Sequence, residues 1–280
     1  EVDILDVWLD SGVSNQAVCK THADLTWPAD LYLEGSDQHR GWFQSSIIPA
    51  VILDGMPPYK AVVTHGYVVD GEGRKMSKKL GNVIEVSYLI SHYGADVVRL
   101  WVAGENYRQD IRLSEEILTR LQDAYRRFRN TFRFLLGNLK NFAPDLTVPY
   151  EDLWEIDRWA LHSAQILKKR ILNAYEECEF HTIYHAAHNF CTVDMSSFYL
   201  DVLKDRLYTF SPDSVERRAA QTVIAEIVKD LLLLLAPVMP FTCEEAWQYL
   251  PVHLVTDWSV HLAQFPQIKS AYVLSEEEHN

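Results

Sequence analysis

Two kinds of hydrophobic pattern follow one another along the chain. Before about residue 110, short apolar runs alternate with segments of helical spacing. Residues 31–33 and 60–64 predict strands, and residues 41–53 predict a helix interrupted by Pro49. Strands alternating with helices predict part of a parallel, doubly wound sheet, in which ligands lie beyond the carboxyl ends of the strands.

Beyond residue 110 the apolar positions keep helical spacing almost throughout. Ser114, followed by two glutamates, predicts a helix start. Residues 154–177 and 180–207 predict two more helices, a third opens at Ser211, and a fourth opens at a capping box formed by Thr242 and Glu245. Antiparallel helices with short loops make a bundle. Residues 275–278 are expected to fray.

These patterns predict an α/β segment followed by an all-α segment. The first is part of a Rossmann-type parallel sheet, and the second is a helix bundle. We place the domain boundaries at residues 1–110, 111–146 and 147–280.

Composition and charge restrict the class of protein. The 280 residues are 48% hydrophobic and contain no apolar run of the length, about 18 residues, that spans a membrane. The net charge of −13 argues against a general nucleic-acid coat protein, although the arginines of residues 120–133 leave a local RNA-binding patch open. The four cysteines form no Cys-x-x-Cys pair, so we expect no zinc site and a reduced, cytoplasmic setting.

The segment with the most distinctive chemistry is residues 71–82, between the second strand and the next helical run. Glycines flank a cluster of four cations, Arg74, Lys75, Lys78 and Lys79. Such a loop suits an anionic ligand over which it closes. A solvated basic turn is the alternative.

The sequence of this loop resembles a known signature. Residues 75–79, Lys-Met-Ser-Lys-Lys, are similar to the Lys-Met-Ser-Lys-Ser motif of class I aminoacyl-tRNA synthetases, with Lys79 in place of the last Ser. Residues 32–43, Tyr-Leu-Glu-Gly-Ser-Asp-Gln-His-Arg-Gly-Trp-Phe, resemble the isoleucine-specific branch of that class, as do residues 6–12 and 64–67. The resemblance continues more loosely to about Gln267. The family's His-x-Gly-His-like motif and an editing domain are not found. The chain is therefore expected to be an internal fragment that cannot form an aminoacyl-adenylate alone.

The resemblance implies ATP-dependent activation of isoleucine and its transfer to isoleucine tRNA. ATP with Mg²⁺ is then a substrate, the protein is expected to be a monomer, and the helix bundle is expected to bind the anticodon region of the tRNA. The implied site residues are Lys75 and Lys78 for catalysis; Lys78, Ser77, His65 and Gly66 for ATP; and Glu34, Gly35, Asp37, Gln38 and Trp42 for the aminoacyl-adenylate.

Several of these residues also have plainer interpretations. A carboxylate just past an apolar strand, such as Glu34, suits an ammonium or a ribose hydroxyl but also a surface ion pair. Ser77 could bond phosphate or cap the loop, Trp42 could be a core residue, and His65 could be a satisfied core group. His181, His185 and His188 have a spacing that could ligate metal, but no Glu or Cys partner completes a site, so packing is favoured.

Two other functions remain open at this point. One is an RNA-binding helical module with a vestigial nucleotide domain. The other is the same class of ligase acting on valine or leucine, against which residues 33–38 argue.

Overall fold

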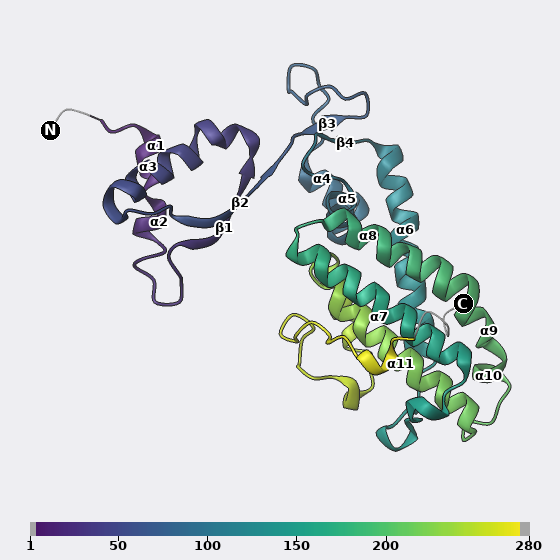
Figure 1. The fold of residues 1–280 in the computed structure, drawn as a ribbon. Helices are drawn as coiled ribbons and strands as arrows, with labels where there is room; N and C mark the ends of the chain where they lie inside the picture. The colour runs from purple at the N-terminus through teal and green to yellow at the C-terminus, as the bar shows by residue number, and fades with distance from the viewer. Residues whose placement is uncertain (1–3, 275–280) are drawn as a thin grey trace. The chain divides into compact units, whose positions relative to one another are not determined.

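The computed structural model describes residues 4–274, so residues 275–278, expected to fray, lie outside the described part. The chain divides into two compact units, each described by itself below (Figure 1). The first comprises residues 1–82 and 107–113, and the second comprises residues 83–106 and 114–280. The domain boundaries drawn from the sequence stay a prediction.

The first unit contains two short parallel sheets and three helices. Strands β1 (Ala29–Gly35) and β2 (Tyr59–His65) form one sheet, and β3 (Val68–Asp70) and β4 (Ile111–Leu113) form the other. The helices are α1 (Val7–Gly12), α2 (Ser14–Ala17) and α3 (Trp42–Asp54), with the 3₁₀ turn η1 (Ser36–Arg40). The two strands and the helix predicted between them are confirmed. Strand β3, which the sequence pattern did not reveal, lies between β2 and the signature loop.

One face of the β1–β2 sheet is covered. Tyr32 is buried against Phe43 of α3, with ring centroids 6.3 Å apart, and Ala50 of α3 is also buried. On the other face, Leu31 and Leu33 are 45% and 56% exposed. Parallel sheets are normally covered on both faces, so this face is one that further structure would be expected to cover.

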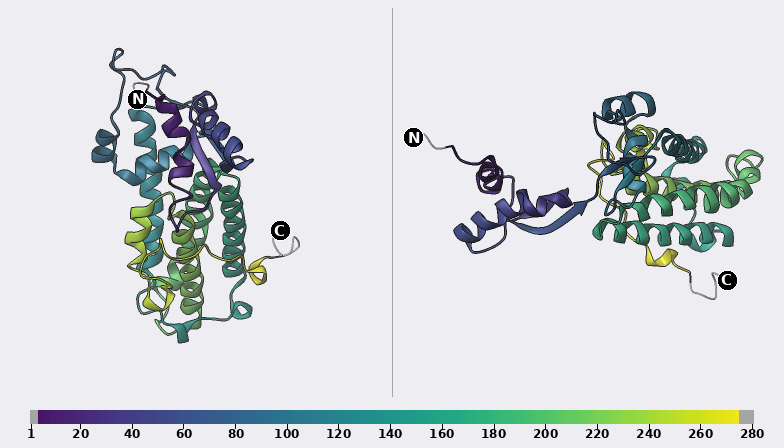
Figure 2. Two further views of the ribbon diagram at one scale, coloured as in Figure 1. Left: turned by 90° about the vertical axis from the view of Figure 1, so that its left-hand side faces the viewer. Right: turned by 90° about the horizontal axis from the view of Figure 1, so that it is seen from above.

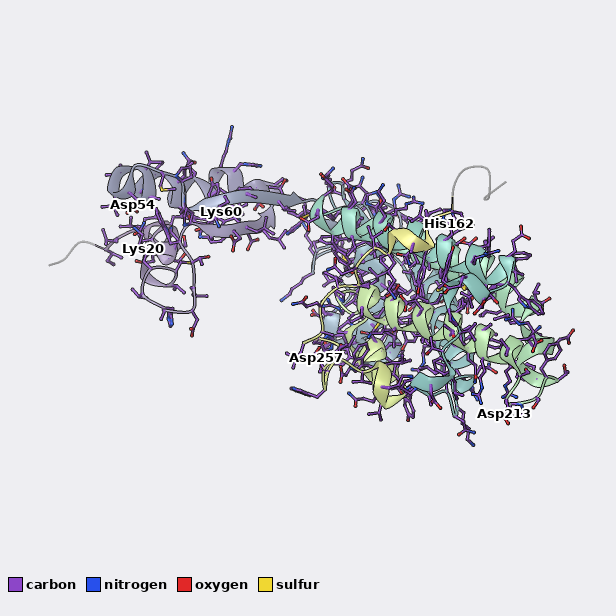
Figure 3. All side chains as sticks on the ribbon, turned by 60° about the horizontal axis from the view of Figure 1, so that its bottom comes forward. Lys20, Asp54, Lys60, His162, Asp213 and Asp257 are labelled. Atoms are coloured by element: carbon purple, nitrogen blue, oxygen red, sulfur yellow. The ribbon has the colours of Figure 1, made fainter. Side chains whose placement is uncertain are left out.

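The prediction that Pro49 interrupts its helix is wrong, because α3 runs through it. Proline lacks the N–H that would bond the carbonyl of Ser45, four residues earlier. That carbonyl faces α1 instead, and a Cβ atom at Gly12 would lie only 2.2 Å from Ser45 O. The end of α3 is also tied to the segment after α2, because Lys20 forms an ion pair with Asp54 (Figure 3).

The second unit is a helix bundle whose long members lie side by side in two views (Figures 1 and 2). Its α-helices are α4 (Val86–Tyr93), α5 (Ala95–Gly104), α6 (Glu115–Gly137), α7 (Glu155–Glu176), α8 (Phe180–Asn189), α9 (Leu200–Val202), α10 (Lys204–Tyr208), α11 (Val215–Leu235) and α12 (Pro240–Trp247). The π-helix η4 (Phe190–Tyr199) continues α8, and short 3₁₀ turns are η2 (Pro144–Leu146), η3 (Tyr150–Asp152), η5 (Val252–Leu254) and η6 (Ser270–Tyr272). Phe128, Ile171, Ile183 and Leu232 are among its fully buried side chains. The predicted bundle is confirmed.

Two predicted helix starts are wrong. Helix α11 begins after Ser214, whose side chain accepts a hydrogen bond from Arg217 N, and not at Ser211. Helix α12 begins at Pro240, so Thr242 is not its N-cap. The carboxylate of Asp96 in α5 takes that place, accepting a hydrogen bond of 2.7 Å from Thr242 N. A capping group from another helix leaves no local sequence signal.

The last described residues run along the bundle. Leu274 N donates a 2.9 Å hydrogen bond to Nδ1 of His162 in α7 (Figure 3). Within residues 4–274, no helix is both long enough and apolar enough to cross a membrane.

Candidate functional site

The predicted amino-acid and adenosine residues meet where β1 and β2 end. In the parallel register Glu34 pairs with Thr64, and Gly35 pairs with His65. His65 Cε1 lies 3.7 Å from the position that a Cβ atom would take at Gly35. Glu34 is exposed, so its carboxylate is open to a ligand. Both strand ends therefore present site candidates at one edge of the sheet, where open parallel sheets bind ligands.

A hydrogen bond to the next residue indicates which ring nitrogen of His65 carries a proton. Its Nδ1 lies 2.7 Å from Gly66 O, and a carbonyl can only accept, so Nδ1 donates and Nε2 is left for another partner. Gly66 is held by its N–H, which donates to Tyr107 O at 2.8 Å. A Cβ atom at Gly66 would lie 2.4 Å from Gln109 O, so only glycine fits there.

The turn after β1 prepares the start of α3. The side-chain oxygen of Gln38 accepts a hydrogen bond of 2.9 Å from Trp42 N and thereby caps the helix. The Trp42 ring stacks on Tyr32 at 4.2 Å with an interplanar angle of 2°, and its Nε1 donates to Ser11 O at 2.9 Å. Strand β1 and helix α1 thus hold Trp42 in one orientation while leaving it partly exposed. Asp37, next to Gln38, is exposed.

Asp70, at the end of β3, is the centre of the signature loop. Its carboxylate accepts hydrogen bonds from Glu72 N, from Arg74 N and Nε, and from Asn82 Nδ2, at 2.8 to 3.0 Å. The bonds from Asn82 and Arg74 hold the pKa of the Asp70 carboxyl well below its usual range, so it stays ionised. Asp70 is only 8% exposed, which makes it an internal anion of the loop.

The sequence suggested that all four cations of the loop face a ligand, but in the structure one of them is engaged within the loop. Arg74 is engaged by Asp70 and by Glu72 at 2.9 and 3.0 Å, because both carboxylates lie within the same turn. Lys75, Lys78 and Lys79 are exposed and form no ion pair within the described part of the chain. Three ammonium groups therefore remain for an anion.

Ser77 turns inward to the loop. Its Oγ accepts a 3.2 Å hydrogen bond from Leu80 N, and its carbonyl accepts from Leu80 N and Gly81 N at 3.1 Å. A helical turn thus starts at Ser77 and ends at Gly81, whose φ of +66° suits glycine. The structure thus contains a capping hydrogen bond of Ser77, and its bond to a phosphate stays a prediction.

Three residues with a place in this site had no role in the sequence interpretation. Tyr67 Cε1 lies 3.8 Å from the Cβ position of Gly35, and Lys75 Nζ lies 6.0 Å from the centroid of the same ring. Tyr67 therefore links the strand-end turn to the signature loop. Asp70 and Asn82 are the others. An Asx residue directly before or after a glycine-rich turn is the signal that could have indicated them.

The helical histidines do not assemble a metal site. Burial lowers the pKa of His185 and of His188. Within residues 4–274, no group of three His, Cys, Asp or Glu side chains is arranged to hold a metal ion.

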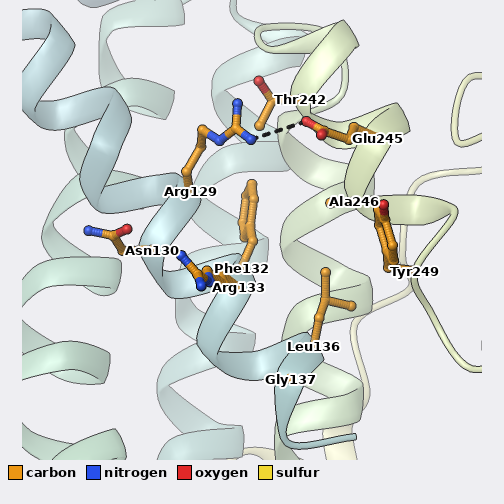
Figure 4. Close-up of a pocket in the computed structure, with 10 residues that line it drawn as sticks. All are labelled: Arg129, Asn130, Phe132, Arg133, Leu136, Gly137, Thr242, Glu245, Ala246 and Tyr249. Atoms are coloured by element: carbon orange, nitrogen blue, oxygen red, sulfur yellow. Dashed lines mark ion pairs between the residues drawn. The ribbon is translucent and has the colours of Figure 1, made fainter. Parts of the chain in front are cut away.

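A second candidate surface lies in the helix bundle, between α6 and α12 (Figure 4). This groove of about 450 Å³ is lined by Arg129, Asn130, Phe132, Arg133, Leu136, Gly137, Thr242, Glu245, Ala246 and Tyr249. Arg129 pairs with Glu245 at 3.3 Å across it. A neighbouring hollow shares Leu136 and Tyr249 and adds Lys140 and His253. Arg129 and Arg133 of α6, Lys140 just beyond its end, and the exposed ring of Tyr249 therefore line two adjoining hollows.

Comparison with known proteins assigns families to both parts of the chain. The family described as "tRNA synthetases class I (I, L, M and V)" matches residues 1–114, and "Anticodon-binding domain of tRNA ligase" matches residues 157–280. An isoleucine–tRNA ligase of Geobacter sulfurreducens is 55% identical over 270 residues, which are 96% of this chain and 29% of that protein. The ligase of the same name from Caldanaerobacter subterraneus is 56% identical over 274 residues, 97% of this chain and 29% of that protein.

Solved structures show the same fold. The LeuRS–tRNA–LeuAMS complex of Agrobacterium radiobacter has a TM-score of 0.71 at 23% identity, covering 89% of this chain and 30% of that one. Methionyl-tRNA synthetase of Mycobacterium tuberculosis, in complex with methionyl-adenylate, has a TM-score of 0.65 at 26% identity, covering 79% of this chain and 44% of that one. The chain thus spans less than a third of the length of the curated relatives that it matches. It belongs to the class I aminoacyl-tRNA synthetases, and its sequence groups with their isoleucine–tRNA ligases.

Proposed function

We propose that this chain is part of an enzyme that activates isoleucine with ATP and transfers it to isoleucine tRNA. The observation that carries the proposal is the 55% identity to an isoleucine–tRNA ligase over 96% of the chain. The edge of the sheet where β1 and β2 end supports it, because Glu34 and His65 both lie there, at the carboxyl ends of neighbouring parallel strands.

In the first step, a carboxylate oxygen of isoleucine attacks the α-phosphorus of ATP. The bond from this phosphorus to the bridging oxygen breaks, and pyrophosphate leaves with the negative charge. Lys78 and Lys75 would neutralise the charge that builds on the phosphates, and Mg²⁺ would arrive with ATP as part of the substrate. In the second step, a hydroxyl of the tRNA attacks the activated carbonyl, and AMP leaves.

The adenosine and amino-acid ends would bind at the strand ends. His65, whose Nε2 is left for another partner, and Gly66 would lie on the adenosine side. Glu34 would accept from the ammonium or a ribose hydroxyl, and Gly35, Asp37 and Gln38 would complete the turn that holds the adenylate.

Trp42 would form a wall for the aliphatic side chain of the amino acid. Its stacking on Tyr32 keeps the indole in place for this role. Isoleucine and valine differ by one methylene, which a hydrophobic pocket distinguishes only by about 1–3 kcal/mol.

The open face of the β1–β2 sheet bears on whether the chain can act alone. With Leu31 and Leu33 exposed, the sheet lacks the cover that a parallel sheet needs. We therefore expect the 280-residue chain to carry only part of the catalytic site and to form no isoleucyl-adenylate by itself.

The groove between α6 and α12 is our candidate for the tRNA contact. Arg133 lines it on the same helix as Arg129, and Lys140 continues the line in the adjoining hollow. These cations stand out on a chain whose net charge is −13. Contacts of Arg and Lys with phosphates would make tRNA binding weaken as the salt concentration rises. A monomer acting in the cytoplasm completes the proposal.

The test uses a full-length ligase that contains this segment. Lys78→Ala should lower the rate of isoleucine-dependent ATP–pyrophosphate exchange by about 10²-fold or more, with a smaller effect on isoleucine binding. Lys79→Ser is the matched control: it removes a neighbouring charge and installs the hydroxyl of the family motif, so exchange should persist. A rate unchanged by Lys78→Ala would remove this residue from catalysis.

The same assay separates the alternative functions. Exchange and tRNA charging are measured with isoleucine, valine and leucine in turn. A preference for valine or leucine would assign another member of the class, and tRNA binding without any exchange would identify a non-catalytic RNA-binding module.

A further inference from the structure

The side chain of Asn82 closes the signature loop on itself. Its Oδ1 accepts a 2.9 Å hydrogen bond from Ser77 N, inside the motif. Its Nδ2 donates to Asp70 Oδ2 at 3.0 Å, and this nitrogen lies 3.4 Å from Lys75 O. One amide therefore ties the end of the loop to its middle and to its beginning.

Asp70 makes the other half of this closure. It accepts from two backbone N–H groups of the first turn as well as from Asn82, so its position fixes residues 71–74 and residue 82 together. The antiparallel bridge between Val69 and Lys75 runs beside it, and Asp70 N donates to Arg74 O at 2.9 Å. The loop is consequently a closed ring of hydrogen bonds rather than an open excursion from β3.

The closure decides which way the cations face. With the backbone of Lys75 and Ser77 held inward by Val69 and Asn82, the ammonium groups of Lys75, Lys78 and Lys79 remain outside the ring and exposed. Preorganised cations stabilise a transition state better than mobile ones, because no free energy is spent in orienting them during the reaction.

We propose that Asn82 and Asp70 form a latch that positions Lys75 and Lys78 for the activation step. They are positioning residues, since they act through the backbone of the loop and touch no reacting atom. The inference rests on the proposed function, because it assigns the latch to the ATP chemistry of that site.

The wild type and three variants test the latch. Asn82→Asp keeps the size and the acceptor for Ser77 N, but it removes the donor and sets a carboxylate against Asp70. The double variant Asp70→Asn/Asn82→Asp removes the repulsion between two carboxylates and reverses the direction of the central hydrogen bond, although the bond from Arg74 Nε to Asp70 is lost. Glu72→Gln is the matched control, because it breaks the exposed pair with Arg74 and leaves Asp70 and Asn82 untouched.

The first measurement is limited trypsin digestion of the 280-residue chain, with the cleavage sites identified by mass spectrometry. Cleavage after Lys75, Lys78 and Lys79 should be about 10-fold faster in Asn82→Asp, because an open loop fits a protease better. The double variant should return toward the wild-type rate of cleavage, and Glu72→Gln should be cleaved at the wild-type rate.

The second measurement is ATP–pyrophosphate exchange by the full-length ligase. Asn82→Asp should lower kcat by about 10- to 100-fold, the loss expected for a misplacement of about 1 Å, while KM for isoleucine stays within about twofold. The double variant should regain part of the lost kcat. A kcat for Asn82→Asp within twofold of the wild type, or trypsin cleavage at the wild-type rate, would overturn the latch.

The two measurements also separate the failure of the latch from the failure of the proposed function. If the wild-type ligase shows no isoleucine-dependent exchange, the proposed function is wrong, and the trypsin rates still decide whether Asn82 closes the loop. If the wild type is active and the variants match it, the latch alone is wrong.

Discussion

A buried charge cluster in the helix bundle gives the sharpest prediction about stability. Asp157 of α7 is 0% exposed and accepts two hydrogen bonds from Arg206 of α10, at 2.9 and 2.8 Å. Tyr199 donates a third, at 2.7 Å. Arg206, itself 3% exposed, also bonds Glu216 O. The cluster therefore joins α7, η4, α10 and the start of α11.

The perturbation is Asp157→Asn, which preserves shape and removes the charge. Arg206 is then left in the interior without a counter-charge, and one Nη group faces the new side-chain amide, which is also a donor. Removing one partner of a buried ion pair costs about 3–5 kcal/mol in the free energy of unfolding. Tyr199→Phe loses a single hydrogen bond to a charged group and should cost about 1.5–3 kcal/mol.

The assay is urea unfolding of the 280-residue chain, followed by the circular dichroism of its helices. Asp157→Asn should lower the midpoint without changing the slope. Asp201→Asn is the control: it makes the same change at an exposed ion pair, with Lys204, between α9 and α10, so its effect should be too small to resolve.

A double-mutant cycle makes the prediction specific. Because each single change leaves a charge uncompensated, Asp157→Asn combined with Arg206→Met should cost less than the sum of the two. Additive costs, or a loss below about 1 kcal/mol for Asp157→Asn, would refute the view that this pair is desolvated and mutually dependent.

Two further predictions concern other parts of the chain. Gly12→Ala would place a Cβ atom 2.2 Å from Ser45 O, so the first unit should lose about 1–3 kcal/mol by urea unfolding, and an unchanged midpoint would argue against this close approach of α1 to α3. Burial raises the pKa of Asp230 from the usual 3.8 to about 6, although Lys168 lies 2.6 Å away. The folded chain then holds a proton that the unfolded chain releases, so this group's contribution to stability is full below about pH 4 and is lost as the pH rises through about 6, by up to about 3 kcal/mol. Unfolding midpoints measured from pH 4 to 7 should fall less steeply in Asp230→Asn than in the wild type, and parallel curves would contradict the assignment.

Much of the candidate site could be found from the chain alone because its elements are local. The run before Glu34, the glycines around residues 71–82 and the spacing of apolar residues in the bundle are all short-range patterns. They correspond to strand β1, to the loop between β3 and α4, and to the helices of the bundle. The four cations of the loop were equally visible in the sequence. The sequence did not show that Arg74 pairs within the loop while the three lysines stay exposed. Whether Arg74 faces a ligand or Asp70 depends on how the turn folds back.

The sequence by itself determined the family, the order of an α/β segment and a helix bundle, and the residues at the strand ends and in the signature loop. Only the tertiary structure decided which groups complete one another: Asp96 capping a helix at Thr242, 146 positions away, Ser45 facing Gly12 because Pro49 cannot bond it, and Asn82 closing the loop on Asp70. The physical reason is that periodicity and propensity act over a few residues. A buried polar group instead pairs with whatever donor or acceptor the folded chain brings within about 3 Å.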